Sequence, residues 1–191
     1  METIWQLQQR LLSYQEEQLR GLLQPYLERR LHHKILGLFA VNAFGNTVFL
    51  GTPADFLGIL DELLIVAASC GINIEKAVWE KYPSMCPYCE NKPCACGGKK
   101  LTAHRRLHAS PRSLTLQEAQ TMLGEIYPPE KMPLESVERH IHEEVMEADA
   151  ELWMWLLSKG SPEKAEEEFA DIFAWMMQAA NTLGIPVAGL V

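Results

Sequence analysis

Hydrophobic residues recur at spacings of three and four along most of the chain, and long alternations of apolar and polar residues are missing. This period is typical of amphipathic helices rather than strands. Gly and Pro interrupt the pattern most densely within residues 83–111, and both residue types tend to end helices. The pattern therefore predicts an all-α fold in which two helical blocks, residues 1–82 and 112–191, flank an irregular segment.

The two blocks share short features at matching positions. The shared positions are Thr3, Ile4, Gln8 and Leu11 with Thr115, Leu116, Gln120 and Leu123, and Gly71-Ile72 with Gly184-Ile185. These matches predict a diverged tandem repeat. The alternative is chance similarity between two amphipathic helical blocks.

Composition and charge narrow the class of protein. With 48% hydrophobic and 22% charged residues among 191, the chain is globular rather than disordered or fibrous. The net charge is −8, but residues 1–111 sum to +2 and residues 112–191 to −10. So acidic a C-terminal block disfavours nucleic acid as a partner and favours a divalent cation.

Membrane insertion and secretion are not expected. No stretch reaches the roughly 18–20 apolar residues of a membrane span. The first residues lack the basic and apolar regions of a secretion signal. We therefore expect a cytoplasmic protein.

Two pairs of carboxylates carry the strongest chemical signal. Glu144 and Glu147 are three residues apart, as are Glu168 and Asp171, so each pair lies on one helix face. A helix break near Gly160, with Ser161 as N-cap before Pro162, predicts an antiparallel hairpin that makes the four acids converge. Such oxygen ligands suit Mg²⁺ or Mn²⁺. Neither helix has the Glu-x-x-His pair of a di-iron bundle.

This pattern resembles the MazG-type all-α nucleoside triphosphate pyrophosphohydrolases. The shared features are E-E-x-x-E, about twenty residues, E-x-x-D and a final helix ending in L-G-I, and they extend from Leu114 to Ile185. The resemblance implies Mg²⁺ ligands at Glu144, Glu147, Glu168 and Asp171, with Glu143 as the first acid of the motif. It also implies cleavage of the α–β phosphoanhydride bond to a nucleoside monophosphate and pyrophosphate.

Further side chains near the motif are weaker candidates for substrate contact. Glu143 is a candidate to accept the proton of the attacking water. Lys164 lies one turn before Glu168 and is a candidate to meet a phosphate, although a solvated salt bridge explains it equally well. Trp153, Trp155 and Trp175 are candidates to stack on a base, but aromatic residues at helical spacing more often belong to a core. Exchange of Glu144 or Asp171 for the amide is expected to remove a metal ligand and leave the bundle folded.

The first block resembles the same family but lacks its acids. Phe39, Ala40 and Ala43 stand at the E-E-x-x-E positions, and Asp55 and Gly58 at those of E-x-x-D. We expect a degenerate repeat that has lost its metal, packs with the second repeat as a pseudo-dimer and forms a wall of its pocket. Further assembly into a homo-oligomer of such pseudo-dimers is left open.

Four of the five cysteines, Cys86, Cys89, Cys94 and Cys96, lie within eleven residues. In a reducing compartment this spacing predicts a metal site rather than disulfides. Four thiolates would close a structural Zn²⁺ site that braces the two repeats. An iron–sulfur cluster, or replacement of one cysteine by His104 or His108, is the alternative.

The sequence thus predicts two MazG-like helical-bundle repeats packed as a pseudo-dimer, with a small Cys-rich metal-binding insert. The expected activity is Mg²⁺-dependent hydrolysis of a nucleoside or deoxynucleoside triphosphate. The alternative is a scaffold that binds nucleotide without turnover, with a structural zinc site.

Overall fold

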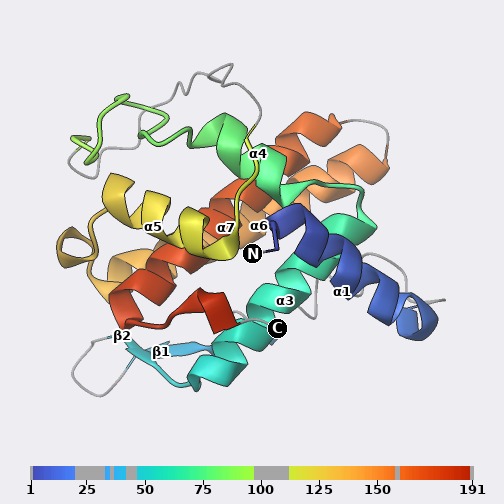
Figure 1. Cartoon of the computed structure of the whole chain (residues 1–191), viewed down its shortest axis with the longest axis horizontal. Helices are drawn as coiled ribbons and strands as arrows, with labels where there is room; N and C mark the ends of the chain where they lie inside the picture. Colours follow the sequence, from blue (N-terminus) through green and yellow to red (C-terminus); the bar gives the residue numbers. More distant parts are fainter. Residues whose placement is uncertain are drawn as a thin grey trace.

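The computed structural model describes residues 2–19, 33–34, 37–41, 47–96, 112–157 and 160–189. Within these ranges the chain is all-α, as predicted, with six α-helices (Figure 1). They are α1 (Ile4–Leu19), α3 (Pro53–Ser69), α4 (Ile74–Lys81), α5 (Leu116–Ile126), α6 (Leu134–Leu156) and α7 (Pro162–Leu183). Two 3₁₀ turns, η1 (Pro129–Lys131) and η2 (Val187–Gly189), complete the helical elements.

One short antiparallel pair of strands departs from the helical pattern. β1 (Phe39–Val41) pairs with β2 (Thr47–Phe49), and Ala40 lies opposite Val48. The prediction of a helix at Phe39 and Ala40, by analogy with the second block, is therefore wrong for their backbone. β-branched and aromatic residues predominate in both strands and favour extended backbone. Ala43, the third position of that comparison, lies outside the described residues.

α6 and α7 form the antiparallel hairpin predicted from the sequence, and they pack against each other along much of their length (Figure 1). α6 ends at Leu156, and Ser161 precedes Pro162 at the first position of α7. Proline suits that position because its missing N–H would lack a helical partner there anyway. At its other end α7 stops at Gly184, whose φ of 67° lies in the left-handed region.

A buried glutamine ties the end of the last long helix to the first helix in each half of the chain. Gln8 of α1 donates from Nε2 to the Ile72 carbonyl and accepts from the Ile74 N–H. Gln120 of α5 donates to the Ile185 carbonyl at 2.8 Å and accepts from the Val187 N–H at 3.2 Å. In both cases the amide satisfies the backbone directly after a left-handed glycine, Gly71 or Gly184. The sequence match between the two halves thus corresponds to matching hydrogen bonds.

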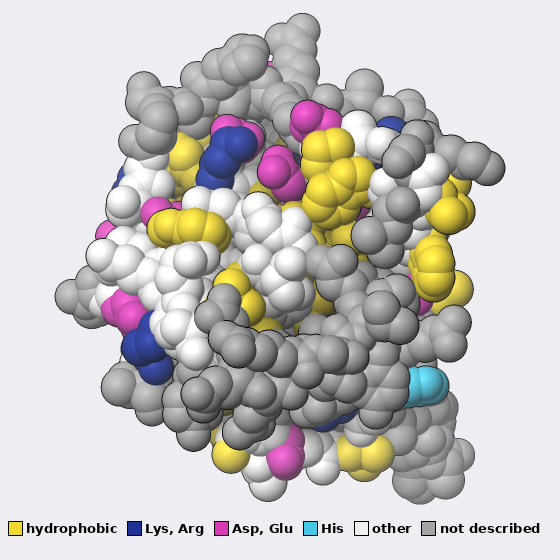
Figure 2. All heavy atoms as spheres, turned by 90° about the vertical axis from the view of Figure 1, so that its right-hand side faces the viewer, with side chains coloured by type: hydrophobic (Ala, Val, Ile, Leu, Met, Phe, Trp, Pro, Cys, Tyr) yellow, Lys and Arg dark blue, Asp and Glu magenta, His cyan; other side chains and the backbone are white. Residues whose placement is uncertain are grey.

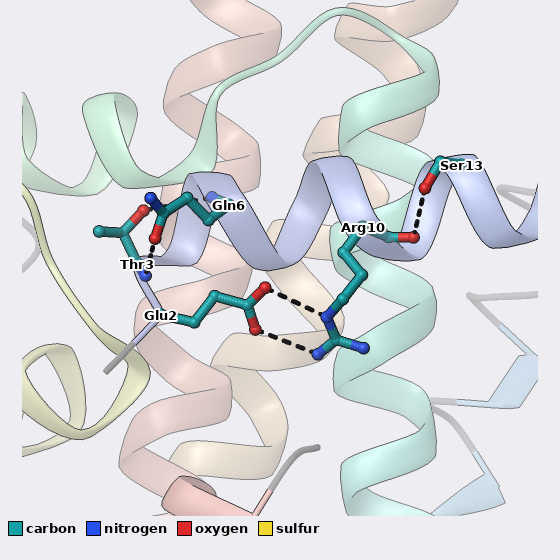
Figure 3. Close-up of polar contacts among 5 residues, drawn as sticks. All are labelled: Glu2, Thr3, Gln6, Arg10 and Ser13. Atoms are coloured by element: carbon teal, nitrogen blue, oxygen red, sulfur yellow. Dashed lines mark hydrogen bonds and ion pairs between the residues drawn. The ribbon is translucent and has the colours of Figure 1, made fainter.

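The first turn of α1 also has a counterpart in the second half. Thr3 and Gln6 cap the helix reciprocally: the Gln6 N–H donates to Thr3 Oγ1, and the Thr3 N–H donates to Gln6 Oε1 (Figure 3). Thr115 and Glu118 form the same capping box at the start of α5. Figure 3 also shows two ionic hydrogen bonds from Arg10 to Glu2, both on the exposed side of α1.

The two halves share one cluster of buried hydrophobic residues, to which Phe56 of α3 and Phe169 and Phe173 of α7 contribute large side chains. Backbone bonds also join the halves: the Ile4 N–H donates to the Leu114 carbonyl at 2.7 Å. α4 packs directly on α7. The last residues of α4 therefore lie beside the carboxylates of α7, and this contact determines the composition of the site.

No single helix in the described part of the chain has the length and hydropathy of a membrane span. α3 and α4 pass that test only together, as a pair bent by 97°.

Candidate metal centres and the cavity between them

Three of the four predicted acids come together between α6 and α7. Carboxylate oxygens of Glu144, Glu147 and Glu168 all lie within 4.8 Å of one another. The i, i+3 spacing places the first two on one face of α6, and the antiparallel hairpin places Glu168 of α7 opposite them. Glu144 is buried, Glu168 is half-buried, and Glu147 is exposed at the edge. This arrangement can hold a cation with oxygen ligands.

Asp171, the fourth predicted ligand, is buried beside this group and bound to residues of the first half. It accepts from Lys81 Nζ at 2.5 Å and from the Tyr82 hydroxyl at 2.6 Å. Lys81 is itself buried and ends α4. The first half thus contributes both a positive charge and a hydrogen-bond donor to the acids.

Burial and mutual repulsion make the carboxylates difficult to ionise together. Burial, followed by the charges of Asp171, Glu168 and Glu147, raises the pKa of Glu144 to about 8, although Lys81 opposes the shift. Burial and the charge of Asp171 raise the pKa of Glu168 to about 7. Oε2 of Glu168 is buried and has no hydrogen-bond partner among the described residues. A cation would provide both the missing partner and the missing charge.

The weaker candidates from the sequence lie outside this group. Glu143 is exposed on α6 and is not one of the three converging carboxylates. Lys164 is exposed, and its ammonium lies 3.5 Å from Glu151 Oε1. This is the solvated salt bridge that the sequence offered as the alternative to a phosphate contact. Trp153 and Trp155 lie near the end of α6, and Trp153 is 42% exposed.

The end of the α6–α7 hairpin also exposes other large hydrophobic side chains, Met154 and Leu157. This end lies at the upper right of Figure 1. Figure 2, which views the molecule from that side, shows hydrophobic side chains next to acidic ones in its upper part.

The four cysteines of the segment after α4 form a second candidate metal centre. Their sulfur atoms lie within 4.8 Å of one another, with Cys86 and Cys96 at 3.7 Å and Cys89 and Cys94 at 3.9 Å. Four thiolates around Zn²⁺, each at about 2.3 Å, would lie about 3.8 Å apart. The predicted cluster is therefore brought together as a four-cysteine set. His104 and His108 lie outside the described residues.

Backbone N–H groups support this cluster. The Ala95 N–H donates to Cys89 Sγ and the Cys96 N–H to Cys94 Sγ, each at 3.4 Å. Burial alone would raise the pKa of Cys89, but backbone donors, that of Ala95 first, lower it to about 6. Thiolate is the form that binds metal. Burial raises the pKa of Cys94 and Cys96, so metal must displace their protons.

The cysteine segment is docked on the second half, as expected of a brace. The Cys94 N–H donates to the Ile126 carbonyl at the end of α5 at 2.7 Å. The Tyr127 hydroxyl lies 3.6 Å from Cys86 Sγ. Because the segment follows α4 directly, the cluster connects the last helix of the first half with the first helix of the second.

A cavity of about 420 Å³ lies between the two candidate centres. Its walls include Glu144 and Asp171 at one side and Cys86, Cys94 and Cys96 at another. The other lining side chains come mainly from α5 through α7, among them Tyr127, Lys131, Arg139, His140, Trp175 and Gln178. Of the three predicted tryptophans, only Trp175 lines it.

Sequence reasoning missed several residues of this site, among them Lys81, Tyr82 and Gln178. Gln178 lies seven residues after Asp171 and thus on the same helix face, which is a usable signal. Lys81 and Tyr82 reach the site through contacts about ninety positions apart in sequence, and no local pattern indicates them. Neither a family model, nor a curated protein, nor a solved structure matches this chain.

The ion pair changes what is expected of an amide at position 171. Asp171→Asn would leave Lys81 buried without its counter-charge, so it should destabilise the fold by about 3 kcal/mol. The double variant Asp171→Asn with Lys81→Met should recover most of that loss. Denaturant unfolding measures the free energy of unfolding of each variant. If the losses of the two single variants simply add in the double variant, the prediction is wrong. Glu80→Gln, which removes the exposed Lys76–Glu80 pair of the same α4, is the control and should cost less than about 0.5 kcal/mol.

The acids should also make stability depend on pH. Folding raises the pKa of Glu168 to about 7 and that of Glu144 to about 8. The folded state therefore binds protons at these two groups more tightly than the unfolded state does. This stabilisation is fully present below about pH 4.5 and is lost as the pH rises through about 7 and 8. In a chelator, the melting temperature should therefore fall by several degrees between pH 5 and pH 8.5. Glu144→Gln should flatten the decline. Mn²⁺ should raise the melting temperature more at pH 8 than at pH 5, and a uniform effect would argue against binding at these acids.

The cysteine cluster should hold one metal ion per chain. Cys86→Ser with Cys89→Ser should abolish metal content, lower the melting temperature and increase proteolysis between residues 85 and 112, because the segment has little core of its own. Cys70→Ala, a change at the end of α3 outside the cluster, should retain the metal. Elemental analysis of the purified protein identifies the metal. Stoichiometric iron together with sulfide would show an iron–sulfur cluster instead of zinc, and the absence of any metal would show that the four cysteines are free thiols.

Proposed function

We propose that the protein is a nucleoside triphosphate pyrophosphohydrolase that uses Mg²⁺ or Mn²⁺ at Glu144, Glu147 and Glu168. The observation that carries this proposal is the convergence of these three carboxylates within 4.8 Å on a helical hairpin. The resemblance of the sequence motif to MazG-type enzymes supplies the reaction class. In this proposal the two halves are MazG-like repeats packed as a pseudo-dimer, and only the second retains its acids.

The donor set fits the metal. All three candidate ligands are hard oxygen donors, and the buried Oε2 of Glu168 has no hydrogen-bond partner among the described residues. Glu144, Glu147 and Glu168 would hold the cation, which would supply positive charge for the phosphate chain and activation of a water molecule for attack on the α-phosphorus. The phosphate chain brings about four negative charges, which the acids alone would repel.

The chain's own residues have distinct parts in this reaction. Lys81 pairs with Asp171 and so reduces the negative charge around the carboxylates. The buried Tyr82 hydroxyl, whose pKa is raised well above its usual value by burial and by Asp171, stays protonated and donates to that carboxylate. Lys131 and Arg139 line the same cavity and contribute positive charge to it, on the side of Ser136.

A proton acceptor for the attacking water is also needed. Glu144 has a pKa of about 8 in the absence of cation, and a bound cation would lower it, so this carboxylate is suited to ligation rather than to proton storage. Glu143, exposed at the edge of the site, remains the candidate base from the sequence motif. Its exposure keeps it free to exchange the proton with solvent.

The fourth acid motivates the competing proposal. Because Asp171 is engaged by Lys81 and Tyr82, the site has three convergent carboxylates rather than four. A site of that kind would also suit a scaffold that binds metal–nucleotide without turnover.

Pyrophosphate release from a panel of ribo- and deoxyribonucleoside triphosphates, with and without Mg²⁺, distinguishes the two proposals. The enzyme should release pyrophosphate and monophosphate in equal amounts only with the cation. Glu144→Gln should reduce the rate by about a hundredfold or more, since it removes one ligand at constant volume. Glu135→Gln, an exposed acid of the same helix, should leave the rate within about twofold. Binding without release in the wild type would favour the scaffold.

A further inference from the structure

The cavity has two ends of different chemistry. On α6, Ser136, His140 and Glu144 follow one another at four-residue spacing along the cavity wall. On α7, Asp171 and Gln178 line the same cavity, two turns apart. Because the two helices are antiparallel, Glu144 and Asp171 lie at an acidic end and Ser136 and Gln178 at the opposite end, whose lining also includes Lys131 and Arg139.

Stacked rings separate the two ends. The His140 and Trp175 rings stack with centroids 4.1 Å apart and an interplanar angle of 16°. Tyr127 lies nearly parallel to Trp175, with centroids 6.2 Å apart. The cavity wall is thus rich in aromatic side chains between its two ends, and aromatic rings favour contact with a planar ligand.

Gln178 is the unusual residue at the end opposite the acids. It is 1% exposed, and neither Nε2 nor Oε1 has a hydrogen-bond partner among the described residues. Gln8 and Gln120, the other glutamines whose side chains the structure describes as buried, each bind backbone groups through both amide atoms. Buried amides without partners are rare because they cost folding free energy, so such a group calls for an explanation.

We propose that Gln178 recognises the hydrogen-bonding edge of a nucleobase held in this cavity; this inference rests on the proposed nucleotide chemistry of the acids. A glutamine amide presents one donor and one acceptor side by side. Base edges present the complementary pair, as in the two-bond contact of glutamine with adenine. A base is also planar, as the aromatic wall requires.

The spacing along α7 fits a nucleotide. Seven residues separate Asp171 from Gln178, which is about 10 Å along the helix axis. With the phosphates at the acidic end, this length leaves room for a sugar before the base reaches Gln178. Ala174, one turn before Gln178, lines the cavity between them with a small side chain.

Binding of nucleoside monophosphates in the presence of Mg²⁺ tests the proposal without catalysis, because a monophosphate has no phosphoanhydride bond to cleave. Equilibrium dialysis with AMP, GMP, CMP and UMP should reveal a preferred base in the wild type. Gln178→Leu should weaken binding of that nucleotide by about tenfold or more and reduce the differences among the four to about twofold. Ribose 5-phosphate, which lacks a base, should bind both proteins equally. Unchanged base preference in the variant, or no binding of any of the four to the wild type, overturns the proposal.

Stability separates a ligand-binding role from a structural one. Gln178→Leu should leave the melting temperature unchanged or raise it by up to about 4 °C, because it removes buried polar atoms that the fold does not pair. Gln120→Leu is the matched control, and it should lower the melting temperature because Ile185 and Val187 lose their partner. A comparable drop for Gln178→Leu would show that the protein itself uses the amide and would overturn the proposal.

The outcomes also separate this proposal from the enzymatic one. One outcome is binding that depends on the base and requires Gln178, with no pyrophosphate released from any triphosphate. It would contradict the enzymatic proposal and support the base site. The opposite outcome is pyrophosphate release whose base preference is unchanged in Gln178→Leu. It would support the enzymatic proposal and contradict the base site.

Discussion

Like charges held close together between α6 and α7 are the constraint on which the rest of the site depends. Glu144 and Asp171 are buried, and Glu147 and Glu168 lie next to them. Folding by itself cannot remove this repulsion, because the hydrophobic packing of the hairpin fixes the helix faces that carry the acids. The protein reduces it in two ways that are visible in the structure: Lys81 is placed on Asp171, and the pKa values of Glu144 and Glu168 rise. A divalent cation at these carboxylates, as proposed above, would reduce it further.

The sequence was sufficient for features that depend on local spacing. The α6–α7 hairpin follows from helical periodicity with Ser161 and Pro162 at the restart, and the structure begins α7 at Pro162. The approach of Glu144, Glu147 and Glu168 follows from i, i+3 spacing on two antiparallel helices. The four cysteines were predictable as a group because so few residues separate them that almost any compact turn brings them together.

Features that depend on contacts distant in sequence could not be predicted. Lys81 meets Asp171 across ninety positions, and nothing near Lys81 in the sequence indicates a buried lysine. The β1–β2 pair was missed for a different reason: comparison with the second block suggested a helix, whereas the residues of the strands themselves favour extended backbone. Local preference prevailed there over a relationship between the halves that holds well at Gln8 and Gln120.

The position of Lys81 connects the two halves of the chain. α4 of the first half presents this buried lysine to Asp171 of the second half. The same α4 leads directly into the cysteine segment, which lines the cavity from a further side. A cation site at the edge of a single hairpin would be open to solvent. With α4 and the cysteine segment from the first half, the acids lie at one end of a partly open cavity that residues of both halves line. The first half therefore completes the cavity wall and contributes to its charge, although it holds none of the three carboxylates that converge.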